Sequence, residues 1–562
     1  MSVLQSLRLK PFHLNDAAIS WVEKTKAGLT LDEKVRQLFV QISMGNDLAT
    51  IENVMAGQPG GIHRFAGADP AEAWKATRHA LELAKVPPFV TGDLEGGGPA
   101  PAFLTPMQSQ LGLAAANDLD LSRKSLEIMA RETSALGYNW TFTPVVDINK
   151  AFQSAVVGTR SSGSDVDKIL AQALVHVKTV QANGFAATAK HWPGEGYDQR
   201  DQHLVTTINP LTIDEWEATF GRLYRGLIDA GVMSVMSAHI AFPAWMEKAG
   251  VPDGIERYRP ASISSHLNEG LLRGHLGFNG LIISDATSMA GLGSFASPST
   301  YAAEIIANGC DMFLFTQNFN RDQAAVLAGC ESGAISAQRL DDAITRVLGL
   351  KAALGLHVKS IDDRMPPVTE ALAGLRTPES LAIADQTTSK SITLVKDVRN
   401  ILPLSPDRYK RVVLIDSGAP SMLPFHAPKK VDVFAKALSG RGFDVRVYDP
   451  ENLPTPENCD LLIYALATES SLIQSRLYID WRREHGGFEQ AMMRFWHDIP
   501  TVMVSFGHPY HLFDAPRVPA YINAWSSIED AQIAVVRKLC GNEPFEGVSP
   551  VDAFCGLPDA RF

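Results

Sequence analysis

Short apolar runs alternate with longer amphipathic stretches between positions 38 and 316 of the chain. Apolar residues in the intervening stretches recur at helical spacing, as at 120–137 and 165–184, and both of these end at a glycine in the helix-stop position. The runs that predict strands are LFVQI (38–42), GIHRF (61–65), FVTGD (89–93), WTFTPV (140–145), AATAK (186–190), MSVMSAH (233–239), LIISD (281–285) and MFLFT (312–316). Strand–helix alternation predicts a parallel sheet, and eight units suit a closed (β/α)8 barrel, although the pattern alone also permits a doubly wound open sheet.

A second α/β domain is expected after the eighth strand. A helical pattern covers 334–356, and the stretch that follows is rich in charges and prolines, which predicts a linker over 357–385. Six further strand-like runs come after it: SITLVKD, RVVLIDSG, DVRVYDP, DLLIYAL, TVMVSFG and AYINAW. We therefore expect a barrel domain over 1–356 and a second domain over 386–562.

Composition narrows the class of function. Lys and Arg number 51 against 62 Asp and Glu, a net charge of −11, with 45 % hydrophobic and 20 % charged residues. This apolar content excludes general disorder. An acidic chain without basic blocks is a poor electrostatic match for nucleic acid, so a small neutral or mildly charged substrate fits better.

Targeting signals and cysteine spacing favour a cytoplasmic protein. Lys10, His13 and Asp16 interrupt the N-terminal stretch, so we expect no signal peptide, and no run approaches the ~20 apolar residues of a membrane helix. The five cysteines are widely spaced and form neither a disulfide framework nor a CxxC pair, which predicts buried, reduced thiols.

Polar residues end several of the predicted strands. Because catalytic groups of a barrel gather at the carboxyl ends of its strands, these endings predict one shared site. Any one of them could instead be a capping or loop-closing residue. They are Asp93 after strand three, Asp147 after strand four, Lys190 and His191 at strand five, His239 at strand six and Asp285 at strand seven.

Asp285 is the sharpest candidate among these residues. It ends the buried apolar run of GFNGLIISDATSM. A carboxylate held there could attack an anomeric carbon and form a covalent glycosyl intermediate. Capping of the following helix is the structural alternative.

The loop from Lys190 to His203 is the second concentration of chemical groups. It reads KHWPGEGYDQRDQH, and its glycines and proline predict a loop. Asp201 can meet His203 there, orient its imidazole and stabilise the protonated form, which suits general acid–base catalysis. A metal site is a weaker interpretation because the spacing is not typical of zinc, and no cofactor is expected.

These residues resemble glycoside hydrolase family 3, in particular its β-N-acetylglucosaminidase branch. Lys190 to His203 is similar to the signature K-H-F-P-G-H-G-D-T-x-x-D-S-H, and GFNGLIISDATSM to G-F-x-G-x-x-x-S-D-x-x-x-M. The resemblance covers nearly the whole chain and implies a TIM-like (β/α)8 barrel followed by an α/β sandwich domain. It implies Asp285 as nucleophile, His203 as general acid–base and Asp201 as its partner. The sugar-binding positions it implies are Asp93, Arg160, Lys190 and His191.

The chain departs from that family pattern at several places. The arginines of "EGGRVxR" are absent, with Gly98 and Pro101 standing there. Glu195 replaces the histidine of the signature, where we expect it either to bind a sugar substituent or to pair with Arg200. The residues that hold the sugar are therefore expected to differ from those of the typical enzyme.

The resemblance and the residues together predict a retaining exo-acting β-N-acetylhexosaminidase that hydrolyses terminal β-linked N-acetylglucosamine. A β-glucosidase-like enzyme of the same fold and a non-catalytic sugar-binding protein are the alternatives. A neutral imidazole base repels anions less than a carboxylate does, so phosphate is a conceivable acceptor in place of water. We expect a small oligosaccharide or glycoside as partner. The sequence does not decide whether the second domain shapes the aglycone side or mediates a homodimer.

Overall fold

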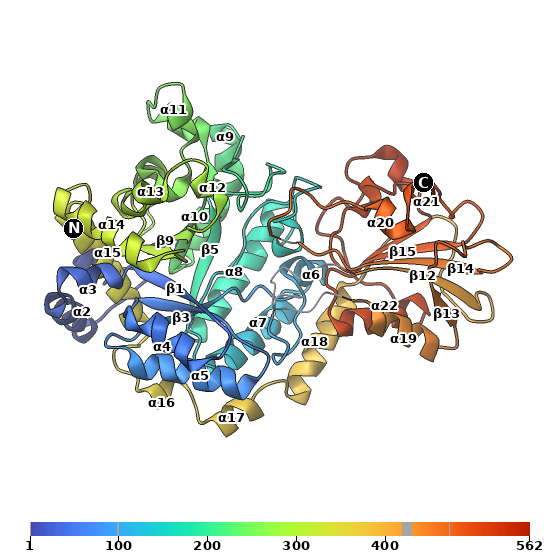
Figure 1. Ribbon diagram of the computed structural model, residues 1–562, viewed down its shortest axis with the longest axis horizontal. Coiled ribbons are helices and arrows are strands. Elements are labelled where there is room, and N and C mark those ends of the chain that lie inside the picture. The colour runs from blue at the N-terminus through green and yellow to red at the C-terminus, as the bar shows by residue number, and fades with distance from the viewer. Residues whose placement is uncertain (1, 98–99, 419–429, 471) are drawn as a thin grey trace.

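The computed structural model describes residues 2–97, 100–418, 430–470 and 472–562, and these form two lobes joined by helices (Figure 1). The larger lobe is a closed barrel in which every paired strand is parallel, in the order β1-β10-β9-β7-β5-β4-β3-β2. Its strands are β1 (Phe39–Met44), β2 (Gly61–Phe65), β3 (Phe89–Gly92), β4 (Trp140–Thr141), β5 (Ala186–Trp192), β7 (Ser234–Ser237), β9 (Leu281–Ala286) and β10 (Met312–Leu314). The barrel is therefore confirmed, and the open sheet is excluded.

Helices surround the barrel. The longest are α2 (Asp16–Gly28), α5 (Pro70–Leu83), α7 (Leu119–Ser134), α8 (Val166–Ala182), α14 (Phe319–Ser332) and α15 (Ala337–Ala353). Shorter ones are α1 (Val3–Ser6), α3 (Leu31–Arg36), α4 (Leu48–Ala56), α6 (Gln110–Ala115), α9 (Ile213–Trp216), α10 (Arg222–Asp229), α11 (Pro243–Lys248), α12 (Ala290–Gly293) and α13 (Pro298–Ala307). Helix α8 ends as its sequence predicts, because Gly184 takes a φ of 83° and Phe185 N–H returns to the Val180 carbonyl.

Other short elements complete the barrel lobe. The two-residue strands β6 (Thr207–Ile208) and β8 (Ile240–Ala241) pair with each other. The π-helical segments are Glu217–Gly221 and His266–His275. The 3-10 turns are Gly158–Arg160, Ile255–Tyr258 and Ala261–Ile263.

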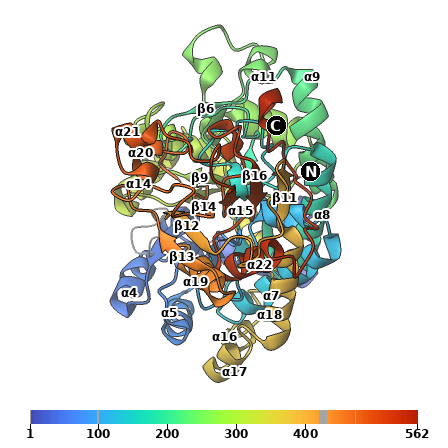
Figure 2. The same ribbon diagram turned by 90° about the vertical axis from the view of Figure 1, so that its right-hand side faces the viewer.

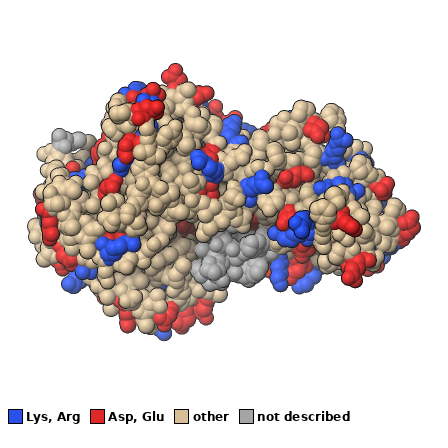
Figure 3. Space-filling model, turned by 45° about the horizontal axis from the view of Figure 1, so that its top comes forward, with Lys and Arg blue, Asp and Glu red and all other residues tan. Residues whose placement is uncertain are grey.

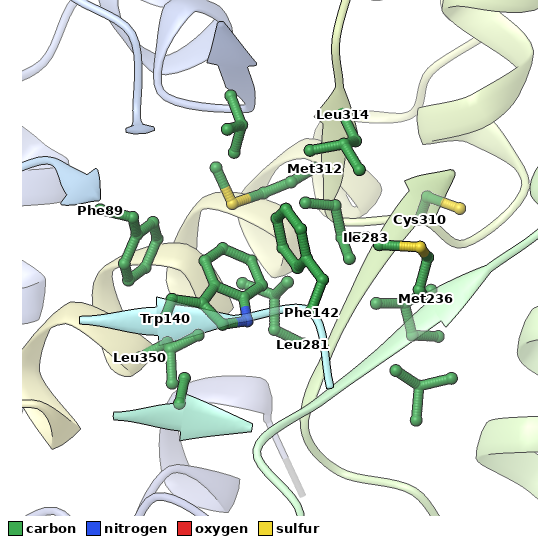
Figure 4. Packing of buried hydrophobic residues seen from close by; sticks show 14 of the residues in the cluster. Phe89, Trp140, Phe142, Met236, Leu281, Ile283, Cys310, Met312, Leu314 and Leu350 are labelled. Atoms are coloured by element: carbon green, nitrogen blue, oxygen red, sulfur yellow. The ribbon is translucent and has the colours of Figure 1, made fainter. Parts of the chain in front are cut away.

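Large side chains fill the barrel interior (Figure 4). Trp140 meets Phe89 and Phe142 edge to face, with ring centroids 4.8 and 5.3 Å apart, and its indole N–H donates to Thr188 Oγ1 at 2.7 Å. This interior is a packed core and not a pore. The reacting groups are therefore confined to the strand ends.

The smaller lobe is a six-stranded sheet in the order β11-β16-β15-β14-β12-β13, parallel except for the β11–β16 pair. All six strands predicted for this region are present. They are β11 (Thr393–Asp397), β12 (Arg411–Ser417), β13 (Asp444–Val447), β14 (Leu461–Leu466), β15 (Thr501–Ser505) and β16 (Ala520–Asn523).

Both faces of the sheet are buried at its central strands, so β14 and β15 are apolar at consecutive positions. In β14, Leu461 and Ile463 face the core under α19 (Asp432–Gly440) and α22 (Glu529–Leu539), and Leu462 and Tyr464 face the opposite core. Helices α20 (Trp481–His485) and α21 (Phe488–Ala491) lie on that opposite side (Figure 2). Short 3-10 turns occupy His511–Phe513 and Pro558–Arg561.

The stretch between the lobes is largely helical. It contains α16 (Ile361–Arg364), α17 (Val368–Ala373) and α18 (Pro378–Ser391), and α18 packs against α7 of the barrel and α22 of the second lobe. On the face shown in Figure 3, basic and acidic side chains are interspersed over both lobes. Among the described residues, no helix has both the length and the apolar character needed to cross a membrane.

Candidate active site

The carboxyl ends of the barrel strands hold the residues singled out from the sequence. Asp285 lies within β9, Lys190 and His191 lie within β5, and Asp93 directly follows β3. Asp201 and His203 come from the loop after β5, and Arg160 from a 3-10 turn at Gly158–Arg160. Glu95 joins Lys190 and Arg160, and Lys190 also contacts Asp93. His203 contacts Asp201, and the charges of His191 and His203 act on Asp285.

Asp285 is placed as a buried carboxylate. Its residue is 7 % exposed, and Ala286 N–H donates to its Oδ1 at 2.7 Å. Burial acts to raise the pKa of Asp285, but the charges of the neighbouring histidines, His191 foremost and His239 next, outweigh it and lower the pKa. The carboxylate is thus ionised at neutral pH, as a nucleophile requires.

His203 and Asp201 are in contact, as expected from their spacing. Asp201 Oδ1 lies 2.6 Å from His203 Nδ1 and also accepts the His203 backbone N–H at 2.8 Å. Burial acts to raise the pKa of Asp201, but the hydrogen bond from His203 and its charge outweigh it and lower the pKa. Because Nδ1 is occupied, Nε2 is the imidazole atom left for a substrate.

A group from the second lobe completes this pair, and the sequence carries no signal for it. Ile473 N–H donates to Asp201 Oδ2 at 2.8 Å across 272 positions of sequence. Asp201 is therefore held at both oxygens, one by the loop itself and the other by the smaller lobe.

Lys190 and Arg160 converge on a carboxylate that the sequence analysis did not single out, Glu95. Lys190 Nζ lies 2.7 Å from Glu95 Oε1 and 2.8 Å from Asp93 Oδ1. Arg160 binds Glu95 through two nitrogens, at 2.8 and 3.0 Å. This bidentate pair fixes the guanidinium plane beside Asp93. Glu95 opens the segment compared with "EGGRVxR", so its signal was present in the sequence, but only the missing arginines of that segment were considered.

The charges in this network reinforce one another. Burial acts to lower the pKa of Lys190, but Asp93 and Glu95 together raise it. Burial acts to raise the pKa of Glu95, and Arg160 and Lys190 lower it below the usual range. Asp93 remains partly open, with 38 % of its side chain exposed, so it can accept a hydrogen bond from a ligand.

His191 is oriented by Asp147, which ends the fourth predicted strand. Asp147 Oδ2 lies 2.6 Å from His191 Nδ1, and Asp147 Oδ1 accepts the backbone N–H groups of His191 and Glu195 at 3.1 and 3.0 Å. Holding Nδ1 in this way leaves Nε2 of His191 as its free face.

Glu195 does not pair with Arg200, so that expectation is wrong; Arg200 binds Asp198 instead, at 2.6 Å. Glu195 is 3 % exposed, and its Oε2 accepts the side-chain N–H of Gln202 at 3.0 Å. Its Oε1 is buried without a hydrogen-bond partner among the described residues. Burial, followed by the charges of Asp147 and Asp201, raises the pKa of Glu195 well above its usual range, so the group is held neutral.

Glu195 is also part of a possible cation site. Asp147, His191 and Glu195 offer ligand atoms that lie within 4.8 Å of one another. The 2.6 Å contact between His191 Nδ1 and Asp147 Oδ2 is a hydrogen bond, and a proton shared there accounts for the arrangement.

Replacing Glu195 with Gln is expected to stabilise the protein increasingly as pH rises from 5 to 8. In the unfolded chain Glu195 has a pKa near 4.5 and releases its proton above that pH, whereas in the folded protein its raised pKa keeps the proton bound. The free energy of unfolding of the wild type therefore falls as pH rises towards the folded-state pKa. Glutamine is neutral throughout and removes this loss, which amounts to at most about 1.4 kcal/mol per pH unit. Urea unfolding of both proteins across this range measures the difference. The exposed Glu489→Gln is the control, and a pH-independent difference for Glu195→Gln would show that Glu195 is ionised.

Two positions of the family pattern bear on sugar binding. Gly98, where the family has an arginine, lies outside the described residues. Pro101 is described and lines a small apolar cavity together with Asp93, Glu95 and His176. Among the described residues, Asp93 contacts Lys190 and His63 and no arginine of this segment.

Comparisons with known proteins identify the family of the chain. Residues 30–350 match the model of the glycosyl hydrolase family 3 N-terminal domain. A protein of Cellulomonas fimi described as a β-N-acetylglucosaminidase/β-glucosidase is 38 % identical over 99 % of both chains. A β-hexosaminidase of Vibrio cholerae is 32 % identical over 45 % of this chain and 71 % of its own.

Solved structures show the same architecture across both lobes. A β-glucoside phosphorylase, BglX, bound to 2FGlc has a TM-score of 0.91 at 33 % identity, covering 98 % of this chain and 100 % of its own. A family 3 β-N-acetylglucosaminidase from Paenibacillus has a TM-score of 0.77 at 24 % identity, covering 94 % and 100 %, which supports the fold. With its barrel, its strand-end carboxylates and this full-length similarity, the chain belongs to glycosyl hydrolase family 3 and is a glycoside hydrolase.

Proposed function

We propose that this enzyme is a retaining exo-acting β-N-acetylglucosaminidase that also accepts β-glucosides. The observation that carries the proposal is the His203–Asp201 pair, held at 2.6 Å on the loop after β5, beside the ionised Asp285. The Cellulomonas fimi relative, whose description includes both sugars, supports this dual range.

In the first step, a carboxylate oxygen of Asp285 attacks the anomeric carbon of a terminal β-linked sugar. The bond to the leaving oxygen breaks, and His203, protonated and stabilised by Asp201, gives its Nε2 proton to that oxygen. The products are the free aglycone alcohol and a glycosyl ester on Asp285.

In the second step, neutral His203 removes a proton from water, and the water oxygen attacks the same anomeric carbon. The ester bond to Asp285 breaks, and the sugar leaves with its original β configuration. An imidazole thus takes the place of the second carboxylate that retaining enzymes commonly use, while Asp285 keeps the usual role.

Asp93, Lys190, Arg160 and His191 hold the sugar in this proposal. Asp93 accepts hydrogen bonds from hydroxyls, and Lys190 and Arg160 donate them. The shared partner Glu95 keeps both cations in fixed positions before substrate arrives. His191 presents Nε2 because Asp147 holds Nδ1.

Phosphate as the acceptor in the second step is a second candidate function. The BglX phosphorylase structure, similar over nearly the full length of this chain, favours it. The physical argument is that neither a neutral His203 nor a neutral Glu195 repels a phosphate anion, whereas an ionised carboxylate base would. Phosphate would attack the glycosyl ester in place of water and yield a sugar 1-phosphate.

Hydrolysis of matched aryl β-glycosides tests the proposed function. We expect kcat/KM for the N-acetylglucosaminide to exceed that for the galactoside and the xyloside by at least about tenfold, with the glucoside second, because each lost pocket contact costs about 1–3 kcal/mol. Preference for a galactoside or xyloside would overturn the sugar assignment and leave the family unaffected. The same reactions with added phosphate decide the acceptor, since phosphorolysis requires a sugar 1-phosphate among the products.

A further inference from the structure

Ile473 is an exposed apolar residue on a segment that the smaller lobe holds against the barrel. On one side, Ser470 Oγ accepts the Thr159 backbone N–H at 2.7 Å. On the other, Leu477 N–H donates to the Gln153 carbonyl at 3.0 Å. Ile473 itself donates its backbone N–H to Asp201. Three residues of the smaller lobe, Ser470, Ile473 and Leu477, are therefore hydrogen-bonded to the barrel.

The backbone of Ile473 is unusual for its residue type. Its φ is +64°, in the left-handed region that β-branched side chains rarely adopt. The conformation aims its N–H at Asp201, whose ionised carboxylate makes a charge-assisted hydrogen bond. This bond and the two flanking contacts offset the backbone strain.

The same conformation leaves the Ile473 side chain 70 % exposed, which is high for an isoleucine on a fixed segment. Asp201 joins Ile473 to His203, the group that protonates the leaving oxygen in the proposed mechanism. The preceding residue, Leu472, lines a cavity with Asp93, Glu95 and Arg160, on the sugar side of the site. Ile473 therefore directly follows a residue on the sugar side and is joined through Asp201 to the acid–base histidine.

We propose that Ile473 determines the preference for the leaving group, its side chain forming an apolar wall for a hydrophobic aglycone beside His203. This inference rests on the proposed function, because it takes His203 as the proton donor. The backbone N–H of Ile473 has a separate role, because it holds Asp201 in position. The second lobe thereby contributes both orientation of the acid–base pair and selection of the aglycone.

The test compares benzyl and methyl β-N-acetylglucosaminides, since both lose an alcohol and differ mainly in apolar area. Ile473→Asn keeps the N–H and suits a positive φ but removes the apolar surface. We expect the benzyl-to-methyl ratio of kcat/KM to fall about five- to tenfold in this variant, as expected for losing contact with part of a phenyl ring. The change should appear mainly in KM, and the pH profile should stay that of the wild type because Asp201 keeps its partner.

Two further variants complete the experiment. Ile473→Leu restores apolar area and should recover the wild-type ratio. Val358→Asn removes an equally exposed β-branched side chain, 73 % exposed, from outside the site and should leave the ratio unchanged. If the benzyl-to-methyl ratio of kcat/KM is unchanged in Ile473→Asn, including by an equal loss on both substrates, the inference is overturned. The proposed function still stands in that case, provided that the wild type cleaves both glycosides. Failure of the wild type on N-acetylglucosaminides and glucosides alike would overturn both.

Discussion

Replacing Asp285 with Asn should lower kcat on every glycoside by about 10⁴-fold or more, because the amide cannot form the glycosyl ester. The fold should survive, since asparagine has nearly the same shape and its Oδ1 can still accept the Ala286 N–H now bound at 2.7 Å. Steady-state kinetics measure the loss, and urea unfolding of the same preparation measures stability.

Ser284→Ala is the matched control for that variant. Ser284 precedes Asp285 on β9, and its Oγ accepts the Leu314 backbone N–H at 3.2 Å. Its loss should cost about 1 kcal/mol of stability and leave kcat within a few-fold of the wild type. A 2-fluoro glycoside, which slows the second step, should add its sugar mass to the wild type and not to Asp285→Asn. Full activity of Asp285→Asn would refute the nucleophile assignment.

His203→Ala should lower kcat/KM by about 10²–10⁴-fold on alkyl glycosides, whose leaving oxygen needs a proton. The rate of the first step should fall far less on 4-nitrophenyl glycosides, because nitrophenolate leaves without needing a proton. Comparing the two leaving groups in one variant separates lost proton donation from general damage to the site.

Asp201→Asn provides a graded companion to that prediction. It keeps an oxygen for the Ile473 N–H but removes the charge that stabilises protonated His203, held at 2.6 Å. We expect the same dependence on the leaving group with a smaller loss. Equal losses on both leaving groups in His203→Ala would contradict the acid–base assignment.

The grouping of the strand-end residues was predictable from the sequence, because all strands of a parallel barrel end at the same face. Asp93, Lys190, His191 and Asp285 each end an apolar run, and parallel strands bring such endings to one face. The Asp201–His203 contact was predictable from a spacing of two residues in a loop. These inferences needed only local pattern and topology.

Glu195 shows where sequence reasoning failed. An ion pair with Arg200 was one of the two roles expected for it, but Arg200 meets Asp198 at the surface and Glu195 is buried beside Asp147. Burial depends on contacts from several strands, so a carboxylate's protonation state cannot be read from its neighbours in sequence. The pairing of Arg160 with Glu95 escaped for the same reason, since 65 positions separate them.

By itself the sequence determined the eight strand–helix units and the six strands of the second lobe, because apolar periodicity and turn residues act locally. Its contiguous motifs pointed to the family, and the closed barrel followed from that resemblance and not from the periodicity. Only the tertiary structure decided which partners fix the reacting groups. The Ile473 N–H on Asp201, the Glu95 bridge between Lys190 and Arg160, and the contact of Glu195 with Asp147 all join segments distant in the chain. Their energies depend on distance and desolvation, which exist only once these segments have packed together.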